Sequence, residues 1–185
     1  MTLTESDKKS LLSLAKRTIE QWFGPDSQDT ESEEEKLNEG LLQYCGAFVS
    51  VYVDDKLRGC IGTFSEEDTL FEHVRQMALS AATADYRFSP IKVDELKKMQ
   101  IEISVLSPRK RIYNANEIVP GVHGIYMIKG FNRGTLLPQV ALKQGWSAEE
   151  FLGNCAKYKA GIGWDGWKSA ELYTYEAIVF RSEPE

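Results

Sequence analysis

Two runs of β-branched and aromatic residues, separated by a short polar break, constrain the fold of this chain more than any other stretch. Residues 47–53 have the sequence AFVSVYV, residues 57–62 have the sequence LRGCIG, and DDK at 54–56 separates them. Such runs predict two strands joined as a β-hairpin. The second run also combines a cation, a thiol and two glycines within six residues, so it is the first place to look for chemistry.

The hydrophobic pattern selects the register of this hairpin. We expect a three-residue loop at 54–56, because it pairs apolar residues with apolar residues or glycine, whereas a two-residue loop would set Val53 opposite Lys56. A slip of one residue would exchange the two faces. The expected pairs are Val53 with Leu57, Val51 with Gly59, and Val49 with Ile61. The opposite face then carries Phe48, Ser50, Tyr52, Arg58 and Cys60.

Cys60 is the candidate nucleophile, because a catalytic thiol must ionise and a nearby cation favours the thiolate. Arg58 lies two residues away on the same expected face. A nucleophile also needs a base, and His123 lies in a tight glycine-flanked turn, whereas His73 lies off the apolar stripe of a predicted helix and is expected to face solvent. We therefore expect Cys60, Arg58 and His123 to be catalytic. The alternative is an inert buried thiol beside a salt-bridged arginine.

Two further pairs are candidate substrate-binding residues. Glycine within a strand often marks a bulge or the close approach of another backbone or a ligand, which points to Gly59 and Gly62. Asp85 and Arg87 belong to DYRFSP at 85–90, where the proline favours extended backbone before it. We expect this segment to fold over the hairpin and to form a wall of a cleft at Cys60. The alternative is a purely structural salt bridge made by Asp85.

Composition and charge exclude several classes of protein. The net charge of −6 argues against a nucleic-acid partner, which requires a basic patch. The three cysteines stand at no metal-ligand spacing, so neither a metal nor another cofactor is expected. GIGWDG at 161–166 follows a predicted helix and precedes a strand, which is the wrong context for a dinucleotide site. The polar first ten residues and the lack of a long apolar run predict a cytoplasmic protein with no membrane partner.

The remaining pattern predicts an α+β fold, with a mixed, largely antiparallel sheet flanked by helices. Helices and strands follow one another without the strict alternation of a doubly wound sheet. We expect one domain over 1–185, with an acidic mobile loop at 24–40. Helices are expected near 4–23, 69–85, 138–144 and 147–158, and strands near 100–107, 121–130, 133–137 and 171–181.

Several motifs resemble those of one known family, the AMMECR-type domains, whose prokaryotic members are called AmmeMemoRadiSam system protein A. The resemblance covers about residues 41–180 and implies an α+β domain with a smaller second lobe. The matching stretches are LRGCIG at 57–62, DYRFSP at 85–90, EISVL at 102–106, GVHGI at 121–125, LLPQVA at 136–141 with GW at 145–146, and KAG at 159–161 with Trp167.

The resemblance leaves three kinds of function open. The family name implies a system that includes a Memo-like protein, related to extradiol dioxygenases, and a radical S-adenosylmethionine protein. The chain would then act with these partners on a small molecule or modified substrate through the LRGCIG cleft, as a carrier or accessory subunit. It could instead be an enzyme that uses Cys60, or a non-catalytic module that binds a peptide, a protein or a small anion in the same cleft.

Overall fold

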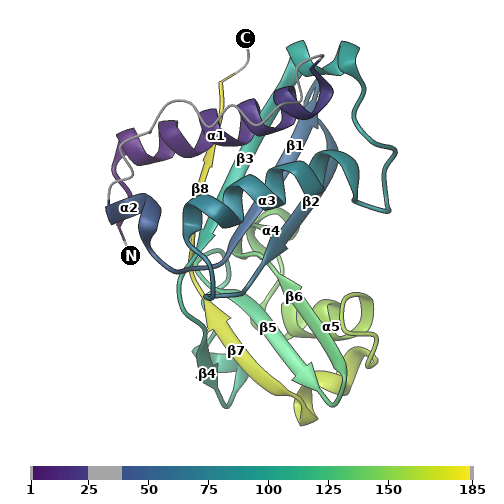
Figure 1. The fold of residues 1–185 in the computed structure, drawn as a ribbon. Coiled ribbons are helices and arrows are strands. Elements are labelled where there is room, and N and C mark those ends of the chain that lie inside the picture. The colour runs from purple at the N-terminus through teal and green to yellow at the C-terminus, as the bar shows by residue number, and fades with distance from the viewer. Residues whose placement is uncertain (1, 25–38, 184–185) are drawn as a thin grey trace. The chain divides into compact units, whose positions relative to one another are not determined.

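The structure is a computed structural model that describes residues 2–24 and 39–183. Apart from its ends, the predicted acidic loop at 24–40 lies outside the described residues. The chain divides into two compact units, one of Met1–Val105 with Ile178–Glu185 and one of Leu106–Ala177 (Figure 1). The predicted α+β class is confirmed, and each unit contains a four-stranded sheet of its own.

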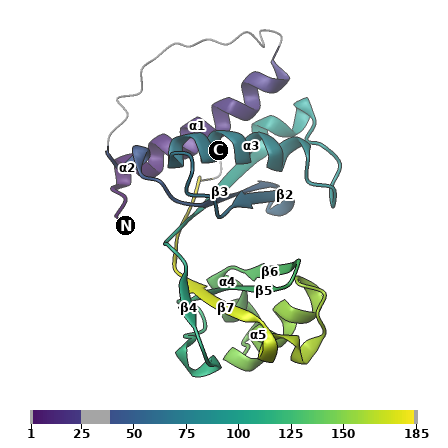
Figure 2. The same ribbon diagram turned by 60° about the horizontal axis from the view of Figure 1, so that its bottom comes forward.

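In the first unit, helices cover one face of a sheet whose strand order is β2-β1-β3-β8. Helices α1 and α3 lie side by side on the same face (Figure 2). Alternate strand residues such as Val49, Val51 and Ile103 are fully buried beneath them. The elements are α1 (Glu5–Phe23), α2 (Glu39–Leu42), β1 (Ala47–Val53), β2 (Lys56–Thr63), α3 (Leu70–Thr83), the 3-10 helix η1 (Val93–Lys98), β3 (Met99–Leu106) and β8 (Ala177–Arg181).

The hairpin forms as predicted, but the predicted three-residue loop is wrong. Val53 pairs with Lys56, so the loop contains only Asp54 and Asp55, whose φ angles of 48° and 59° are left-handed. Aspartate tolerates this conformation better than most residues, and two-residue hairpin loops favour it. Arg58 is then an extra residue in β2, which forms a β-bulge.

The bulge restores the register that the hydrophobic pattern predicted. Beyond it, Val51 pairs with Gly59 and Val49 with Ile61, as expected, and Ser50 pairs with Cys60. Val49 is fully buried and Ile61 packs against the same core. The assignment of residues to the two faces of the hairpin is therefore confirmed on the part of β2 that carries the thiol.

His73 is buried, and the prediction that it faces solvent is wrong. Its Nδ1 lies 3.0 Å from the carbonyl oxygen of Cys45, and its exposed fraction is 2%. The segment before β1 explains the burial, because Tyr44 forms a β-bridge with Thr69 at the N-terminus of α3. Helix α3 therefore has a second covered flank that its apolar stripe did not indicate.

In the second unit, the strand order is β4-β7-β5-β6 and the pairs are antiparallel. Helices α4 and α5 share one apolar core with inward residues such as Ile125 and Met127. The predicted strand at 171–181 is divided between the two sheets as β7 and β8. The elements are β4 (Lys110–Ile112), the 3-10 helix η2 (Ala115–Glu117), β5 (Gly124–Lys129), β6 (Asn132–Leu136), α4 (Pro138–Gln144), α5 (Ala148–Tyr158), the 3-10 helix η3 (Trp164–Ser169) and β7 (Glu171–Tyr175).

Candidate functional site

Strand β2 is an edge strand of the first sheet, and a pair of side chains occupies its outer edge at Cys60. The backbone N–H of Cys60 donates to Asp85 Oδ2 at 2.8 Å, and Arg87 Nη2 donates to the carbonyl oxygen of Cys60 at 3.1 Å. An edge strand otherwise exposes unpaired backbone N–H and carbonyl groups, with which another chain can pair. The Asp85–Arg87 pair thus supplies the backbone N–H and carbonyl of Cys60 with the hydrogen bonds that a neighbouring strand would provide.

Asp85 and Arg87 are also joined to each other. Arg87 Nε donates to Oδ1 at 2.9 Å and Nη2 donates to Oδ2 at 2.6 Å, in a bidentate ion pair. The Asp85 side chain is only 2% exposed. The hydrogen bonds from Arg87 outweigh burial and hold the pKa of Asp85 at about 2. The segment therefore lies against Cys60, as we expected, and it also forms the salt bridge that we gave as the alternative.

Arg58 is engaged in the same way by a different carboxylate. Its Nε and Nη2 donate to the two carboxylate oxygens of Glu95 at 2.8 and 3.0 Å, and its Nη1 donates to the carbonyl oxygen of Ser89 at 3.2 Å. Chiefly because of the hydrogen bond from Arg58, the pKa of Glu95 is about 2. Arg58, at the bulge, thus connects β2 to Ser89 and to Glu95 of η1, in the segment that precedes β3.

The surroundings of Cys60 do not favour the thiolate, whereas we expected a nearby cation to favour it. Burial raises the pKa of Cys60, and the nearby carboxylates Asp85 and Glu102 raise it further. A hydrogen bond with Ser50 and the charge of Arg87 lower the pKa of Cys60, but by less than burial and the carboxylates raise it. The cation that acts on the thiol is therefore Arg87, since Arg58 is paired with Glu95.

The two glycines of LRGCIG have packing partners within the first unit. A Cβ atom on Gly59 would lie 1.9 Å from the carbonyl oxygen of Ala81, so glycine lets helix α3 approach the strand. A Cβ atom on Gly62 would lie 2.1 Å from the ring of Phe48. The close approach that we expected is made by a helix backbone and by an aromatic ring. A role for either glycine in binding substrate stays a prediction.

A row of polar side chains crosses the sheet face on which Cys60 lies. The register sets Cys60 on β2 opposite Ser50 on β1, and Ser50 opposite Glu102 on β3. Tyr52 lies beside this row; burial, and then the negative charge of Glu102, raise its pKa. The Arg181 guanidinium lies 4.2 Å from the centre of the Tyr52 ring. We call the four residues Ser50, Tyr52, Cys60 and Glu102 the polar face.

Sequence reasoning missed Glu102 as a member of this face. Polar Glu102 stands between the apolar residues Ile101 and Ile103, a pattern that turns it away from the core. In the structure Glu102 is half-buried between two buried neighbours. What the sequence did not indicate was which strand lies beside β1. A carboxylate beside a thiol, a hydroxyl and a phenol offers donors and acceptors within one small area, which suits a polar ligand.

His123 lies in the second unit, in the turn before β5. The backbone N–H of Val119 donates to its Nδ1 at 3.1 Å, and its own backbone N–H donates to the carbonyl oxygen of Val119 at 2.9 Å. With Nδ1 accepting, the proton of the neutral ring is on Nε2. The Cys60–His123 dyad and the predicted cleft around Cys60 stay predictions.

The other two cysteines are buried, and burial raises the pKa of Cys45 to about 11 and that of Cys155 to about 12. Both thiols are therefore less readily ionised than a free thiol. Within residues 2–24 and 39–183, no three His, Cys, Asp or Glu side chains are grouped so that they could hold a metal ion. None of the described helices is long and apolar enough to cross a membrane.

Comparison with known proteins gives consistent matches along almost the whole chain. The AMMECR1 family model matches residues 12–180. Protein MK0488 of Methanopyrus kandleri is 38% identical over 98% of this chain and 91% of its own length, and a protein of Methanosarcina mazei is 34% identical over 98% and 94%. The crystal structure of the uncharacterized protein PH0010 from Pyrococcus horikoshii superposes with a TM-score of 0.86 at 32% identity, covering 95% of this chain and 91% of that one.

Proposed function

The chain belongs to the AMMECR1 family, and on that premise we propose that its polar face binds a small polar molecule or a modified side chain. In this proposal the chain works in the cytoplasm with a Memo-like protein and a radical S-adenosylmethionine protein, and supplies them with the bound molecule. The partners follow from the resemblance of the motifs to AmmeMemoRadiSam system protein A. The binding role follows from the geometry of the first sheet.

The observation that carries the binding role is the row Cys60–Ser50–Glu102 across three adjacent strands. Strands hold their side chains more precisely than loops do, so a constellation on three strands is already organised for a ligand. Cys60, Tyr52 and Glu102 are each partly exposed, which leaves a thiol, a phenol and a carboxylate within reach of a small molecule. The side chains of Tyr52 and Glu102 are hydrogen-bonded to each other, and a ligand would offer donors to the remaining acceptor positions of Glu102.

The chemistry of Cys60 favours binding over nucleophilic attack. A nucleophilic cysteine acts as the thiolate, whereas burial and two carboxylates raise the pKa of this thiol and keep it protonated at neutral pH. A catalytic role would need a base, and His123 is the candidate that the sequence offers. In the proposed function Cys60 therefore serves as a neutral contact of the ligand, with Ser50 beside it.

The alternative function is a non-catalytic module that binds a peptide or a protein on the same face. One observation favours it. Each of the three charged residues of the two motifs, Arg58, Asp85 and Arg87, already makes a hydrogen bond to backbone within the first unit. A motif that shapes a strand edge suits a recognition surface as well as a small-molecule site.

A reconstituted mixture would test the proposal. The purified chain is combined with a Memo-like protein, a radical S-adenosylmethionine protein and a metabolite pool, and conversion is followed by mass spectrometry. We expect conversion only when all three proteins are present, and a loss of conversion with Glu102→Gln and with Cys60→Ala.

Glu72→Gln is the matched control, because Glu72 is a half-exposed carboxylate on α3 that pairs only with Arg75 among the contacts described for its side chain. Equal conversion with and without the chain would refute the proposal. Conversion that needs the chain but survives both polar-face variants would support the protein-binding alternative.

A further inference from the structure

The turn between β5 and β6 in the second unit presents a bare aromatic ring to solvent. Lys129 pairs with Asn132, so the turn contains only Gly130 and Phe131. Gly130 has a φ of +60°, and a glycine of positive φ at the first of two loop positions is the pattern of a type II′ turn, which closes a hairpin tightly. The Phe131 side chain at this apex is 104% exposed, so nothing else in the described chain covers it.

Two exposed cations flank this ring, one on each face of the hairpin. Residues that pair across an antiparallel ladder share a face, and successive residues of a strand alternate between faces. Lys129 therefore lies on the face of Met127, which packs in the core with α5. Arg133 pairs with Ile128, so it lies on the other face. The cations thus surround the apex instead of following one side of it.

A third cation joins Lys129 on the helix side of the hairpin. A Cβ atom on Gly134 would lie 3.1 Å from the Cβ of Lys159, which places the end of α5 against β6. Gly134 pairs with Met127, so Lys159 approaches the face on which Lys129 lies. In the described part of the chain, neither lysine forms an ion pair, and nor does Arg133. We call these three cations and the ring of Phe131 the hairpin tip.

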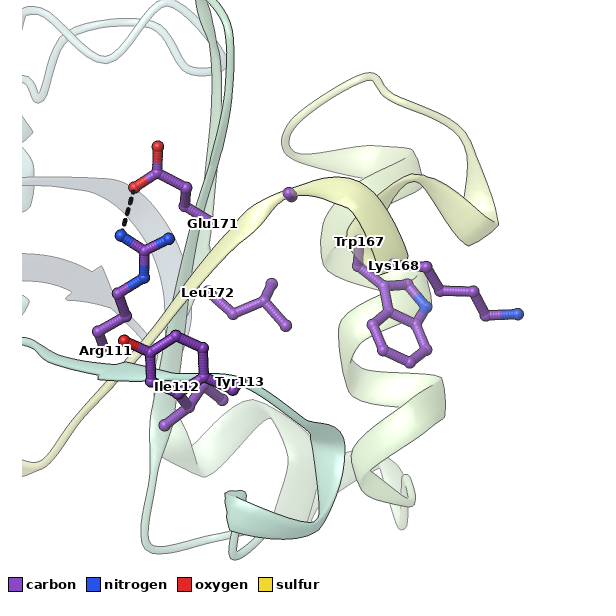
Figure 3. A pocket seen from close by; sticks show the side chains of 8 residues that line it. Arg111, Ile112, Tyr113, Trp167, Lys168, Glu171 and Leu172 are labelled. Carbon is purple, nitrogen blue, oxygen red and sulfur yellow. Dashed lines mark ion pairs between the residues drawn. The ribbon is translucent and has the colours of Figure 1, made fainter.

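The carboxylate that shares the face of Arg133 is already paired with another cation. Glu171 of β7 and Arg133 of β6 both lie opposite Ile128, so two strand spacings, about 10 Å, separate their backbones. Glu171 Oε2 lies 3.3 Å from Arg111 Nη1, as the dashed line in Figure 3 shows. The second unit, residues 106–177, has nine Lys and Arg against six Asp and Glu, a net charge of +3 in a chain of net charge −6. The hairpin tip therefore keeps its positive charge.

The shape of the hairpin tip selects among the partners that a ring and free cations suit. A protein interface buries about 800 Å² on each side, far more than a two-residue turn offers. Single-stranded nucleic acid is bound in a groove whose cations follow one track, whereas these cations lie on both faces of a protruding turn. A surface of anionic headgroups surrounds an inserted tip on all sides, so it meets the cations of both faces at once.

We propose that the hairpin tip docks the chain on a membrane surface that contains anionic lipids. The Phe131 ring inserts among the headgroups, and Lys129, Arg133 and Lys159 lie against the negative groups of the lipids. We predicted no membrane partner because the chain has no long apolar run, and attachment by one ring and its flanking cations needs none. The site shares no residue with the polar face and does not depend on the function proposed for Cys60.

Sedimentation of the intact chain with lipid vesicles tests this proposal. The probes are vesicles of phosphatidylcholine alone and vesicles of an equimolar mixture of phosphatidylcholine and phosphatidylserine. We expect binding to the mixed vesicles only, and an affinity that falls as salt is added. Phe131→Ala should bind about tenfold more weakly, because the apolar area of the ring is no longer buried. Lys129→Gln and Arg133→Gln should each bind about fivefold more weakly and show less salt dependence.

Two variants of the same unit are matched controls. Tyr113→Ala removes an 80% exposed aromatic ring that lies just after β4, outside the hairpin tip. Lys143→Gln removes an exposed cation of α4, which follows the end of β6 away from the turn. Both variants should bind the mixed vesicles as the unmodified chain does. Circular dichroism should show that Phe131→Ala folds normally, since its side chain packs against nothing.

The proposal is overturned if the mixed vesicles do not sediment the chain, or if Phe131→Ala and Tyr113→Ala bind them equally well. A labelled oligothymidylate is the second probe. If it binds in a way that needs Phe131 while the vesicles do not bind, the hairpin tip is a nucleic-acid site and the proposal is overturned as well. None of these outcomes bears on conversion in the three-protein mixture.

Discussion

The carboxylate of Asp85 accepts the backbone N–H of Cys60 at 2.8 Å, across the outer edge of β2. This bond joins the motifs LRGCIG and DYRFSP of the first unit, through two residues that are 25 positions apart in the chain. Arg87 completes the arrangement by donating to the carbonyl oxygen of the same residue. The edge strand is thereby closed at the position of the thiol, which fixes the backbone from which Cys60 projects.

Replacing Asp85 should destabilise the first unit strongly. Asp85→Ala removes a buried acceptor and leaves the Cys60 N–H without its partner, so we expect a loss of about 2–3 kcal/mol in the free energy of unfolding. Asp85→Asn can still accept from that N–H and should cost less. Urea denaturation followed by circular dichroism measures both. Glu72→Gln, at a half-exposed carboxylate of α3, serves as control, and a loss for Asp85→Ala no larger than for this control would contradict the assignment.

The two depressed carboxyl pKa values predict acid sensitivity. The pKa is about 2 for Asp85, against an ordinary 3.8, and about 2 for Glu95, against an ordinary 4.5. A group whose pKa is lower in the folded state contributes stability above its unfolded pKa and loses it as the pH falls towards its folded pKa. The free energy of unfolding should therefore decrease from about pH 5 to about pH 2.

Denaturation curves at a series of pH values measure this dependence. Glu95→Gln lowers stability at neutral pH but should flatten the decrease over the acid range, because one of the two titrating groups is gone. Glu72→Gln should leave the slope as it is in the unmodified chain. Parallel slopes for Glu95→Gln and the unmodified chain would show that the Arg58–Glu95 pair does not form in solution.

Local patterns in the sequence predicted much of the hairpin and its faces. Apolar alternation was enough to pair Val51 with Gly59 and Val49 with Ile61, because a buried face fixes the register. The loop length was not predictable from the same pattern. The extra residue Arg58 sits in a bulge, and a bulge allows a shorter loop to give the same pairing further along the strand.

The partners of the site residues could not be predicted, because they depend on contacts between distant parts of the chain. Arg58 looked like a cation for the thiol, but its carboxylate partner Glu95 lies 37 residues further on. Glu102 reaches the polar face only because β3 lies beside β1. A local pattern determines neither the strand order nor the path of the segment before η1. The sequence therefore did not identify the groups that shift the pKa of the Cys60 thiol.

Gly59→Ala should be among the most damaging single-methyl additions in the chain. The added Cβ would lie 1.9 Å from the backbone oxygen of Ala81, and a helix backbone cannot yield as a flexible side chain does. We expect a loss of about 3 kcal/mol or more, at the upper end for an overpacked core. Thermal unfolding measures it. Gly130→Ala is the comparison. Its φ of +60° makes an alanine there cost about 1–2 kcal/mol in backbone strain, but no atom lies within 4 Å of the added Cβ. Similar losses for the two variants would mean that α3 is not so close to β2.

The rate of alkylation against pH should separate the three thiols and report what acts on Cys60. Cys60 is less buried than Cys45 and Cys155, so iodoacetamide should modify it first, but only slowly at pH 7, because burial raises its pKa. Glu102→Gln removes a negative charge that raises this pKa, so its alkylation curve should move to lower pH. Arg58→Ala should move the curve little, since Arg58 is paired with Glu95. Mass spectrometry of the labelled peptides identifies each site. A curve that moves to higher pH with Arg58→Ala, and stays in place with Glu102→Gln, would restore Arg58 as the cation that activates the thiol, and with it the nucleophilic role for Cys60.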